Sequence, residues 1–235
     1  MNLRQCIVRG CGIAGILAGA TVHAHEFHGY LTLTSDYVFR GASQSNEDAT
    51  VQAGLDYRHP GGVFAGAFAA HTEFPENSFG SNPGSLELDA YLGYSREARR
   101  GWSWDVAAIH YDFPDSRGFD YSYDELAANL RFRDFLRLGA TLSDDASAGG
   151  ASGWTAEIEV RQPLGDRYQV SGLLGHYEFE RSDWEDYLYW DLGISAVAGP
   201  VTFDLRYFDT NDDEAAFAGR QLTGSRLVGS VSVGF

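Results

Sequence analysis

Residues 226–235 read Arg-Leu-Val-Gly-Ser-Val-Ser-Val-Gly-Phe, and this stretch decides the fold class. Every second position is apolar or glycine, and Ser230 and Ser232 lie between them. Successive side chains of a β-strand point to opposite faces, so a strand here has one apolar face and one more polar face. The apolar face comprises Leu227, Gly229, Val231, Val233 and Phe235.

The same period of two recurs from His28 onward, in segments of about ten residues that turn residues separate. Charged side chains often occupy every second position of these segments, which excludes a helix with one continuous apolar face. We predict twelve strands, at residues 28–40, 50–59, 63–73, 85–96, 102–112, 122–132, 135–143, 153–162, 167–179, 187–197, 201–208 and 222–235.

The connections between these strands alternate in length. Short turns such as 60–62 and 198–200 alternate with longer linkers such as 41–49 and 209–221. Bacterial outer-membrane barrels have short turns at one end and long loops at the other, and their strands need roughly 9–11 residues to span. We therefore predict an all-β fold, a closed up-and-down antiparallel transmembrane β-barrel of about 12 strands. The alternative is a soluble β-sandwich with irregular loops.

A membrane location would force the sheet to close, because unpaired backbone groups at a sheet edge cost several kcal/mol each in hydrocarbon. The first strand must then pair with the last. Aromatic residues near the segment ends are expected to form two girdles at the lipid–water interfaces. They include Trp102, Trp104 and Tyr168 toward the short turns, and Tyr37, Phe39, Tyr187 and Tyr189 toward the long linkers.

The composition excludes several other classes. The 235 residues carry 17 basic and 33 acidic side chains, and the net charge of −16 would repel nucleic acid. A transmembrane helix needs roughly 20 apolar residues, and the longest weakly polar stretch, residues 13–22, is about half that length. With 14% aromatic residues the chain can bury too much surface to be disordered, and two cysteines cannot make a disulfide scaffold.

The first residues have the pattern of an export signal. Arg4 and Arg9 precede a short apolar run of small residues, which ends at Val22-His23-Ala24. A positive region, a short apolar region and a small-residue cleavage site are typical of a secretory signal peptide. We predict a cleaved signal at residues 1–24 and a barrel domain at 25–235, located in the bacterial outer membrane.

The last strand also resembles the C-terminal signal of outer-membrane barrels, which ends in phenylalanine after alternating apolar residues. We therefore assign an assembly signal to Phe235, Val233 and Val231, and we expect the barrel-insertion machinery to be a partner.

Residues 33–41, Leu-Thr-Ser-Asp-Tyr-Val-Phe-Arg-Gly, are followed by Ser43-Gln44-Ser45 and then by Val-Gln-Ala-Gly-Leu-Asp-Tyr at 51–57. This region is similar to the opening signature of the TorF-type porin family. The resemblance covers residues 30–75 and implies an outer-membrane porin barrel whose substrate it does not identify.

If the apolar face meets lipid, the other face lines a lumen. On one strand, Asp36 and Arg40 would lie about 13 Å apart and could not pair directly. Acidic residues outnumber basic ones, so we predict passive diffusion of small solutes, with cations or neutral polar solutes favoured over anions. The alternative is a lumen closed by salt bridges. The predicted pore-lining residues are Asp36, Arg40, Gln52, Asp56, Glu73, Glu87, Asp89, Asp105, Glu157, Glu159, Arg161, Asp204, Arg206 and Arg226.

Two other functions remain open. An outer-membrane lipid hydrolase would need a nucleophile and a histidine, and neither His71, placed on the inward face, nor His110 has a serine motif nearby. A structural or recognition barrel would use its acidic long loops toward lipopolysaccharide and outer-membrane lipids. We predict no catalytic, cofactor-binding or metal-binding residues and no nucleic-acid partner, and we leave oligomerisation open.

Overall fold

The computed structural model describes residues 25–74, 83–180, 185–211 and 222–235. The predicted signal peptide at 1–24 lies outside the described residues. Among the residues described, no helix is long and apolar enough to cross a membrane. The helical elements described are two short 3-10 turns, η2 (Arg99–Gly101) and η3 (Ala146–Ala148).

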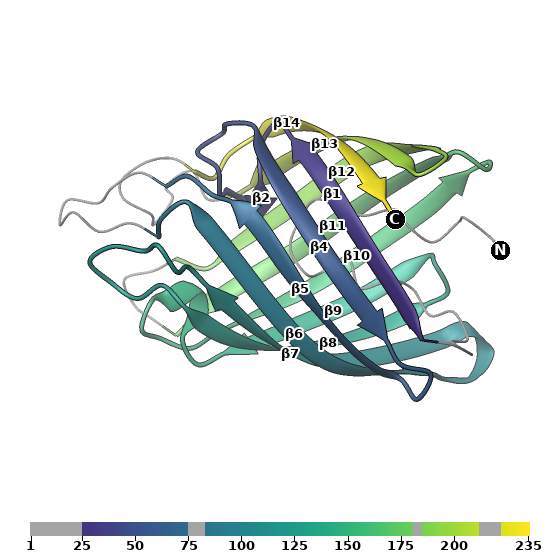
Figure 1. The fold of residues 1–235 in the computed structure, drawn as a ribbon, viewed down its shortest axis with the longest axis horizontal. Helices are drawn as coiled ribbons and strands as arrows, with labels where there is room; N and C mark the ends of the chain where they lie inside the picture. The colour runs from purple at the N-terminus through teal and green to yellow at the C-terminus, as the bar shows by residue number, and fades with distance from the viewer. Residues whose placement is uncertain (1–24, 75–82, 181–184, 212–221) are drawn as a thin grey trace.

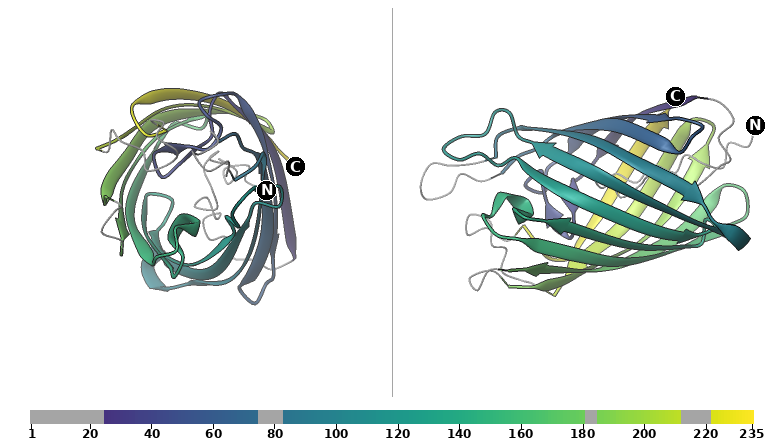
Figure 2. Two further views of the ribbon diagram at one scale, coloured as in Figure 1. Left: turned by 90° about the vertical axis from the view of Figure 1, so that its left-hand side faces the viewer. Right: turned by 90° about the horizontal axis from the view of Figure 1, so that it is seen from below.

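Twelve strands form one closed antiparallel barrel (Figure 1; Figure 2). Each barrel strand pairs with the next barrel strand along the chain, so that β1 pairs with β4. The first strand, β1, also pairs with the last, β14, and this pairing closes the wall. The fold prediction is confirmed, and the sandwich alternative is excluded because the sheet has no free edge. The strands are β1 (Glu26–Thr34), β4 (Thr50–Arg58), β5 (Val63–His71), β6 (Leu86–Glu97), β7 (Trp102–Asp112), β8 (Tyr123–Phe132), β9 (Leu136–Ser143), β10 (Gly153–Leu164), β11 (Tyr168–Phe179), β12 (Tyr187–Ala198), β13 (Val201–Thr210) and β14 (Arg226–Gly234).

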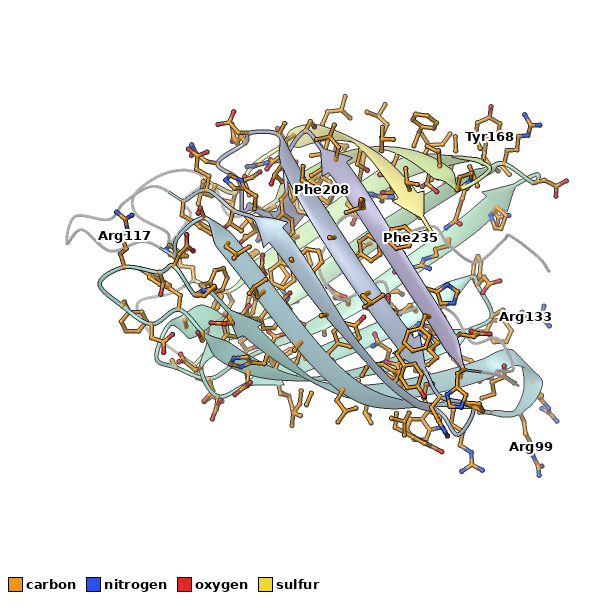
Figure 3. The ribbon with its side chains drawn as sticks, viewed as in Figure 1. Arg99, Arg117, Arg133, Tyr168, Phe208 and Phe235 are labelled. Atoms are coloured by element: carbon orange, nitrogen blue, oxygen red, sulfur yellow. The ribbon has the colours of Figure 1, made fainter. Side chains whose placement is uncertain are left out.

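The two faces of the wall differ as the alternation predicts. Leu126 and Leu192 are 64% and 60% exposed on the outer face, whereas Gln52 and Glu159 are 0% and 1% exposed on the inner face. Tyr168 also projects outward from the wall (Figure 3). A water-soluble protein buries its apolar side chains and exposes its polar ones, and this barrel does the reverse. Its apolar exterior is the surface expected of a lipid-facing barrel.

The prediction of one strand over 28–40 is wrong. β1 ends at Thr34, and residues 35–49 leave the wall, with a two-stranded ribbon made by β2 (Val38–Phe39) and β3 (Ala42–Ser43). We call residues 35–49 the inward segment. Arg40 and Gly41, at φ 49° and 83°, reverse the chain between β2 and β3, so the alternation of a strand cannot continue.

The predicted aromatic girdle on the long-loop side is also wrong in part. Tyr37 and Tyr189 are 1% and 3% exposed and pack inside the barrel, as does Tyr177. Tyr37 packs on Phe68 and Ala70, whereas Tyr177 and Tyr189 pack together with Ala146.

Candidate functional site: the inward segment and the lumen

Polar contacts anchor the start of the inward segment. The Asp36 carboxylate accepts hydrogen bonds from the Ser43 and Ser45 hydroxyls, at 2.6 and 3.0 Å. Its second oxygen lies 2.9 Å from Nη1 of Arg226, on the neighbouring strand β14. The Ser45 hydroxyl in turn accepts the backbone N–H of Tyr37. Asp36 therefore folds the segment back on itself and fixes it to the wall.

The tip of the segment reaches the opposite wall. Nη1 and Nη2 of Arg40 lie 2.6 and 2.7 Å from the two carboxylate oxygens of Glu125, on β8. Nη2 also donates to the Thr141 hydroxyl of β9, at 3.2 Å, and the Tyr187 hydroxyl donates to the Arg40 carbonyl. Around the closed barrel β8 lies five strand steps from β1 in one direction and seven in the other, so the inward segment crosses the lumen.

The turn that carries Arg40 lies very close to the wall. A Cβ atom added at Gly41 would lie 2.3 Å from Cγ2 of Thr210 and 2.9 Å from Cβ of Tyr189. Both the positive φ and this close approach require glycine, so the sequence can form this turn only with Gly41.

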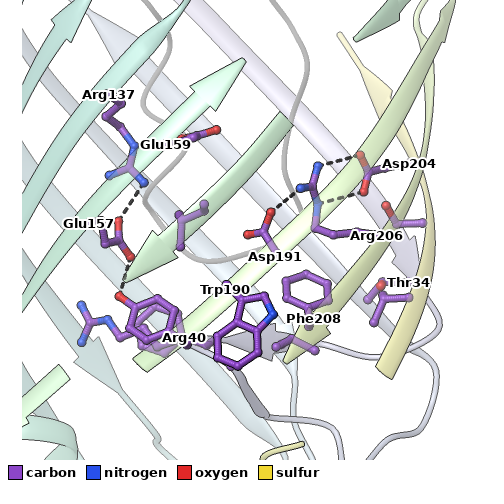
Figure 4. A pocket seen from close by; sticks show the side chains of 17 residues that line it. Thr34, Arg40, Arg137, Glu157, Glu159, Trp190, Asp191, Asp204, Arg206 and Phe208 are labelled. Atoms are coloured by element: carbon purple, nitrogen blue, oxygen red, sulfur yellow. Dashed lines mark hydrogen bonds and ion pairs between the residues drawn. The ribbon is translucent and has the colours of Figure 1, made fainter. Parts of the chain in front are cut away.

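Ion pairs cover much of the inner wall. Nη2 and Nε of Arg137 lie 2.7 and 2.9 Å from Glu157 and Glu159, which lie on the adjacent strand β10 (Figure 4). Tyr189 donates to the other oxygen of Glu157 at 2.6 Å. Most of these groups are less than about a tenth exposed, and a buried charge needs such partners to offset its lost hydration.

Further pairs follow the same rule. Arg206 bonds Asp204, at 3.1 Å, and also Asp191 (Figure 4). Arg161 lies 2.6 Å from Glu159, and Arg131 pairs with Asp105. A salt-bridge network of the kind that the alternative interpretation required is therefore present on the inner wall, and the Arg40–Glu125 pair extends it to the inward segment.

A small cavity remains between the inward segment and the wall formed by β9–β14. Its volume is about 60 Å³, and Arg40, Glu157, Asp191 and Arg206 are among the residues that line it (Figure 4). A cavity needs roughly 10–15 Å³ to hold one water molecule, so this one has room for a few water molecules beside charged groups.

Three side chains on another part of the inner wall have unpaired polar atoms. Gln52, Glu87 and Asp89 are 0%, 4% and 3% exposed. Both amide atoms of Gln52, Oε2 of Glu87 and both carboxylate oxygens of Asp89 have no hydrogen-bond partner in the described structure. Buried polar atoms of this kind are uncommon and need an explanation.

The structure brings most of the predicted pore-lining residues to the barrel interior. Asp36 and Arg40 come from the inward segment instead of a strand, and Asp36 bonds Arg226 directly. Glu73 is placed differently from the prediction: it follows the end of β5 and is exposed, on the same side as the exposed His71. The strand-borne residues on the inner face are Gln52, Asp56, Glu87, Asp89, Asp105, Glu157, Glu159, Arg161, Asp204, Arg206 and Arg226.

Sequence reasoning missed several interior residues. Glu125, Arg131 and Arg137 are 3%, 7% and 5% exposed and pair with predicted residues or with the inward segment. Their position in the alternation is a usable signal: Glu125 and Arg131 share a face of β8 with Tyr123, opposite to Leu126.

Both histidines considered for an enzyme, His71 and His110, are exposed on the outer face, so the inward placement predicted for His71 is wrong. Nδ1 of His110 is 2.8 Å from Oδ1 of Asp124, and the two side chains are 53% and 75% exposed. Within the described residues, no hydroxyl bonds to His110, and the Ser143 hydroxyl donates to the backbone carbonyl of Asp124 instead of to the imidazole.

The residues assigned to the assembly signal lie at the closing seam. Val233 and Val231 are register partners of Leu31 and Leu33 on β1. Phe235 exchanges two backbone hydrogen bonds of 2.9 Å with Gly29. These residues therefore belong to the pairing that closes the barrel, and recognition by the insertion machinery stays a prediction.

A family model described as "Bacterial protein of unknown function (Gcw_chp)" matches residues 18–233. No curated protein matches the chain by sequence. This family differs in name from the TorF-type porins, and that finer resemblance stays a prediction.

Solved outer-membrane proteins share the fold. The KdgM porin has a TM-score of 0.53 at 8% identity, with 90% of this chain and 99% of the porin covered. The KdgM porin in complex with disordered oligogalacturonate has a TM-score of 0.54 at 7% identity, with coverage of 90% and 99%. The COG4313 outer membrane channel from Pseudomonas putida F1 has a TM-score of 0.52 at 11% identity, with coverage of 89% and 95%. At these identities the comparisons establish a shared barrel fold.

Proposed function

The chain belongs to the Gcw_chp family of bacterial proteins, and from that premise and its barrel fold we propose that it is an outer-membrane channel for passive diffusion of small solutes. Similarity in fold to porins and channels supports this role. The apolar outer face would meet lipid, and the long loops would face outward toward lipopolysaccharide. Export would use a signal at residues 1–24, and insertion would use the last strand.

We further propose that the channel favours cations and neutral polar solutes over anions. The main observation behind this proposal is that two carboxylates of the inner wall, Glu87 and Asp89, have no arginine partner among the described residues. Other arginines of the lumen, such as Arg40 and Arg137, are bonded to carboxylates that offset their charge. In their ionised form these two carboxylates give this part of the lumen an uncompensated negative field, and the sign of that field sets ion preference in a pore.

The same charges argue against a polyanionic solute. The KdgM structure includes oligogalacturonate, and that ligand belongs to KdgM. A chain of carboxylates would have to pass Glu87 and Asp89, whereas Arg40 and Arg137 are already bonded to carboxylates of this barrel.

The test is planar-bilayer recording of the refolded barrel in a KCl gradient. We expect conductance with a reversal potential of the cation-selective sign, and a smaller reversal potential in the variant Glu87→Gln/Asp89→Asn. Asp144→Asn, at an exposed loop position, is the control for loss of one charge outside the lumen and should leave selectivity near that of the native protein. Anion preference, or a double variant with unchanged selectivity, would contradict the charge argument.

A non-conducting recognition barrel is the second candidate. The observation that favours it is the inward segment, which crosses the lumen and is bonded to both walls through Asp36 and Arg40. Absence of conductance from a refolded, membrane-inserted barrel would support this candidate over the channel.

A further inference from the structure

We propose that Gln52, Glu87 and Asp89 form a site for a divalent cation, calcium in particular, and that this cation holds the inward segment against the wall. The site lies on β4 and β6. It is separate from the ion pairs around Arg137 and Arg206 on the far side of the barrel.

The first argument is burial without partners. Five polar atoms of these three residues lack a hydrogen bond, although each residue is less than about a twentieth exposed. Burying an unpaired carboxylate costs far more than burying a neutral group. Elsewhere in this barrel a buried carboxylate bonds an arginine, as Glu159 bonds Arg137 and Arg161. A bound cation would remove the exception.

The second argument is placement. Glu87 and Asp89 are two residues apart on one face of β6, about 6.6 Å along the strand. Gln52 lies in the same row across the wall: it is the register partner of Ala70, and Ala70 is the register partner of Glu87. Ala70, which lies between them, has a small side chain, and the Tyr37 ring packs on it beside the two polar residues.

The third argument is the donor set. Two carboxylates and an amide carbonyl are oxygen ligands of the kind that hard cations prefer. Calcium accepts six to eight oxygens at roughly 2.3–2.6 Å in flexible geometry, so water can complete its shell in a polar lumen. Magnesium demands near-ideal octahedral geometry and suits this uneven set less well. Among the described residues, no group of three or more histidine, cysteine, aspartate or glutamate side chains could hold a metal ion, and at this site the amide oxygen of Gln52 would be the third protein ligand.

The site also touches the inward segment. The side chain of Tyr37 hydrogen-bonds Glu87 and packs on Phe68 and Ala70, with the Tyr37 and Phe68 ring centroids 6.0 Å apart. A cation that fixes Glu87 therefore fixes the acceptor of Tyr37. Its binding would stabilise the inward segment in the lumen.

The experiment is thermal unfolding of the refolded full barrel in detergent, in EDTA and in millimolar CaCl₂. We expect calcium to raise Tm by about 5 °C or more, because a ligand that binds the folded state stabilises it by mass action. The shift should disappear in Glu87→Gln/Asp89→Asn and shrink in Gln52→Leu. Asp144→Asn/Asp145→Asn removes two loop carboxylates and should keep the shift.

Terbium gives a second measurement that does not depend on the variants being stable. Tyr37 can sensitise its luminescence, which calcium should quench by displacement in the native barrel. A calcium shift that survives the double variant would place the cation on the loops, and no shift at all would mean that the carboxylates hold protons or water; either result overturns the site. Calcium at this site would offset the charges of Glu87 and Asp89, so the cation preference proposed above applies to the calcium-free barrel, and the bilayer recordings are made in EDTA. Failure of the calcium assay leaves the proposal of a diffusion channel standing, and a silent bilayer leaves the site standing.

Discussion

Arg40 and Glu125, 85 residues apart in sequence, make a two-pronged ion pair that joins the inward segment to β8. Their side chains are 6% and 1% exposed. The guanidinium also lies over the rings of Phe39 and Tyr177, at 4.6 and 5.0 Å from the centroids. This pair is the point at which a segment that begins at one wall is fixed to the other.

Replacing Arg40 with alanine should release the tip of the inward segment. Removal of one member of a buried pair leaves an uncompensated charge, so we expect the free energy of unfolding to fall by about 3 kcal/mol. If the barrel conducts, single-channel conductance should rise because the lumen is less obstructed. Chemical denaturation and bilayer recording measure the two effects.

The matched variant is Arg40→Ala/Glu125→Gln. It removes the unpaired carboxylate, so it should recover part of the lost stability while it keeps the higher conductance. Conductance that stays at the native level in both variants would show that the inward segment does not limit the current.

Leu192 tests the orientation of the wall. It lies near the middle of β12 and is 60% exposed on the outer face. Arginine at the centre of a lipid-facing strand costs about 2–4 kcal/mol, whereas near the interface the cost falls to about 0–1 kcal/mol. We expect Leu192→Arg to lower stability in lipid vesicles by the larger amount and Tyr168→Arg, at the start of β11, by the smaller. Equal costs at both positions would argue against a membrane-spanning wall.

The strands of the wall were predictable from the sequence because the alternation of apolar and polar residues can be seen within each strand. The alternation of Trp154, Ala156 and Ile158 with Thr155 and Glu157 predicts one strand and its two faces, and the structure has both. Membrane strands leave little freedom, since each must be about the same length and must pair on both sides.

The inward segment was not predictable in this way because its contacts are distant. Asp36 is bound by Arg226, 190 residues later in the sequence, and Arg40 by Glu125. The local signal was weak: Val38 and Phe39 are adjacent apolar residues that break the alternation, and Gly41 follows them. Which arginine meets which carboxylate depends on the register around the barrel, and a single sequence does not state that register.

Asp115 supplies a pH-dependent contact at the long-loop end. The Ser85 hydroxyl donates to its carboxylate at 2.7 Å, and the backbone N–H groups of Ser85 and Leu86 donate as well. These hydrogen bonds favour the charged form and hold the pKa of Asp115 below its ordinary value, the Ser85 hydroxyl contributing most.

A lowered pKa means that the contact stabilises the folded loop above the ordinary carboxyl pKa and is lost as pH falls through the lower folded value. We expect the NMR titration midpoint of the Asp115 carboxyl to lie below about 3.9, the ordinary value for aspartate. Ser85→Ala should raise it toward that value. A midpoint that does not respond to Ser85→Ala would mean that the hydroxyl does not stabilise the carboxylate.

Gly29 and Phe235 test how the barrel closes. The two residues exchange a pair of backbone hydrogen bonds, and a Cβ atom added at Gly29 would lie 2.4 Å from Cε2 of the Phe235 ring. Gly29→Ala must therefore displace the ring from β1. We expect this variant to lower the free energy of unfolding by about 1 kcal/mol and to slow insertion into lipid vesicles.

Gly229→Ala is the matched control. Gly229 lies on the neighbouring strand β14, and a Cβ atom added there would meet nothing within 4 Å. In the background of Phe235→Ala the ring is already absent, so Gly29→Ala should add little further loss. Additive losses in the double variant would instead show that the methyl group disturbs the β1–β14 pairing itself, and that the ring of Phe235 has no part in closing the seam.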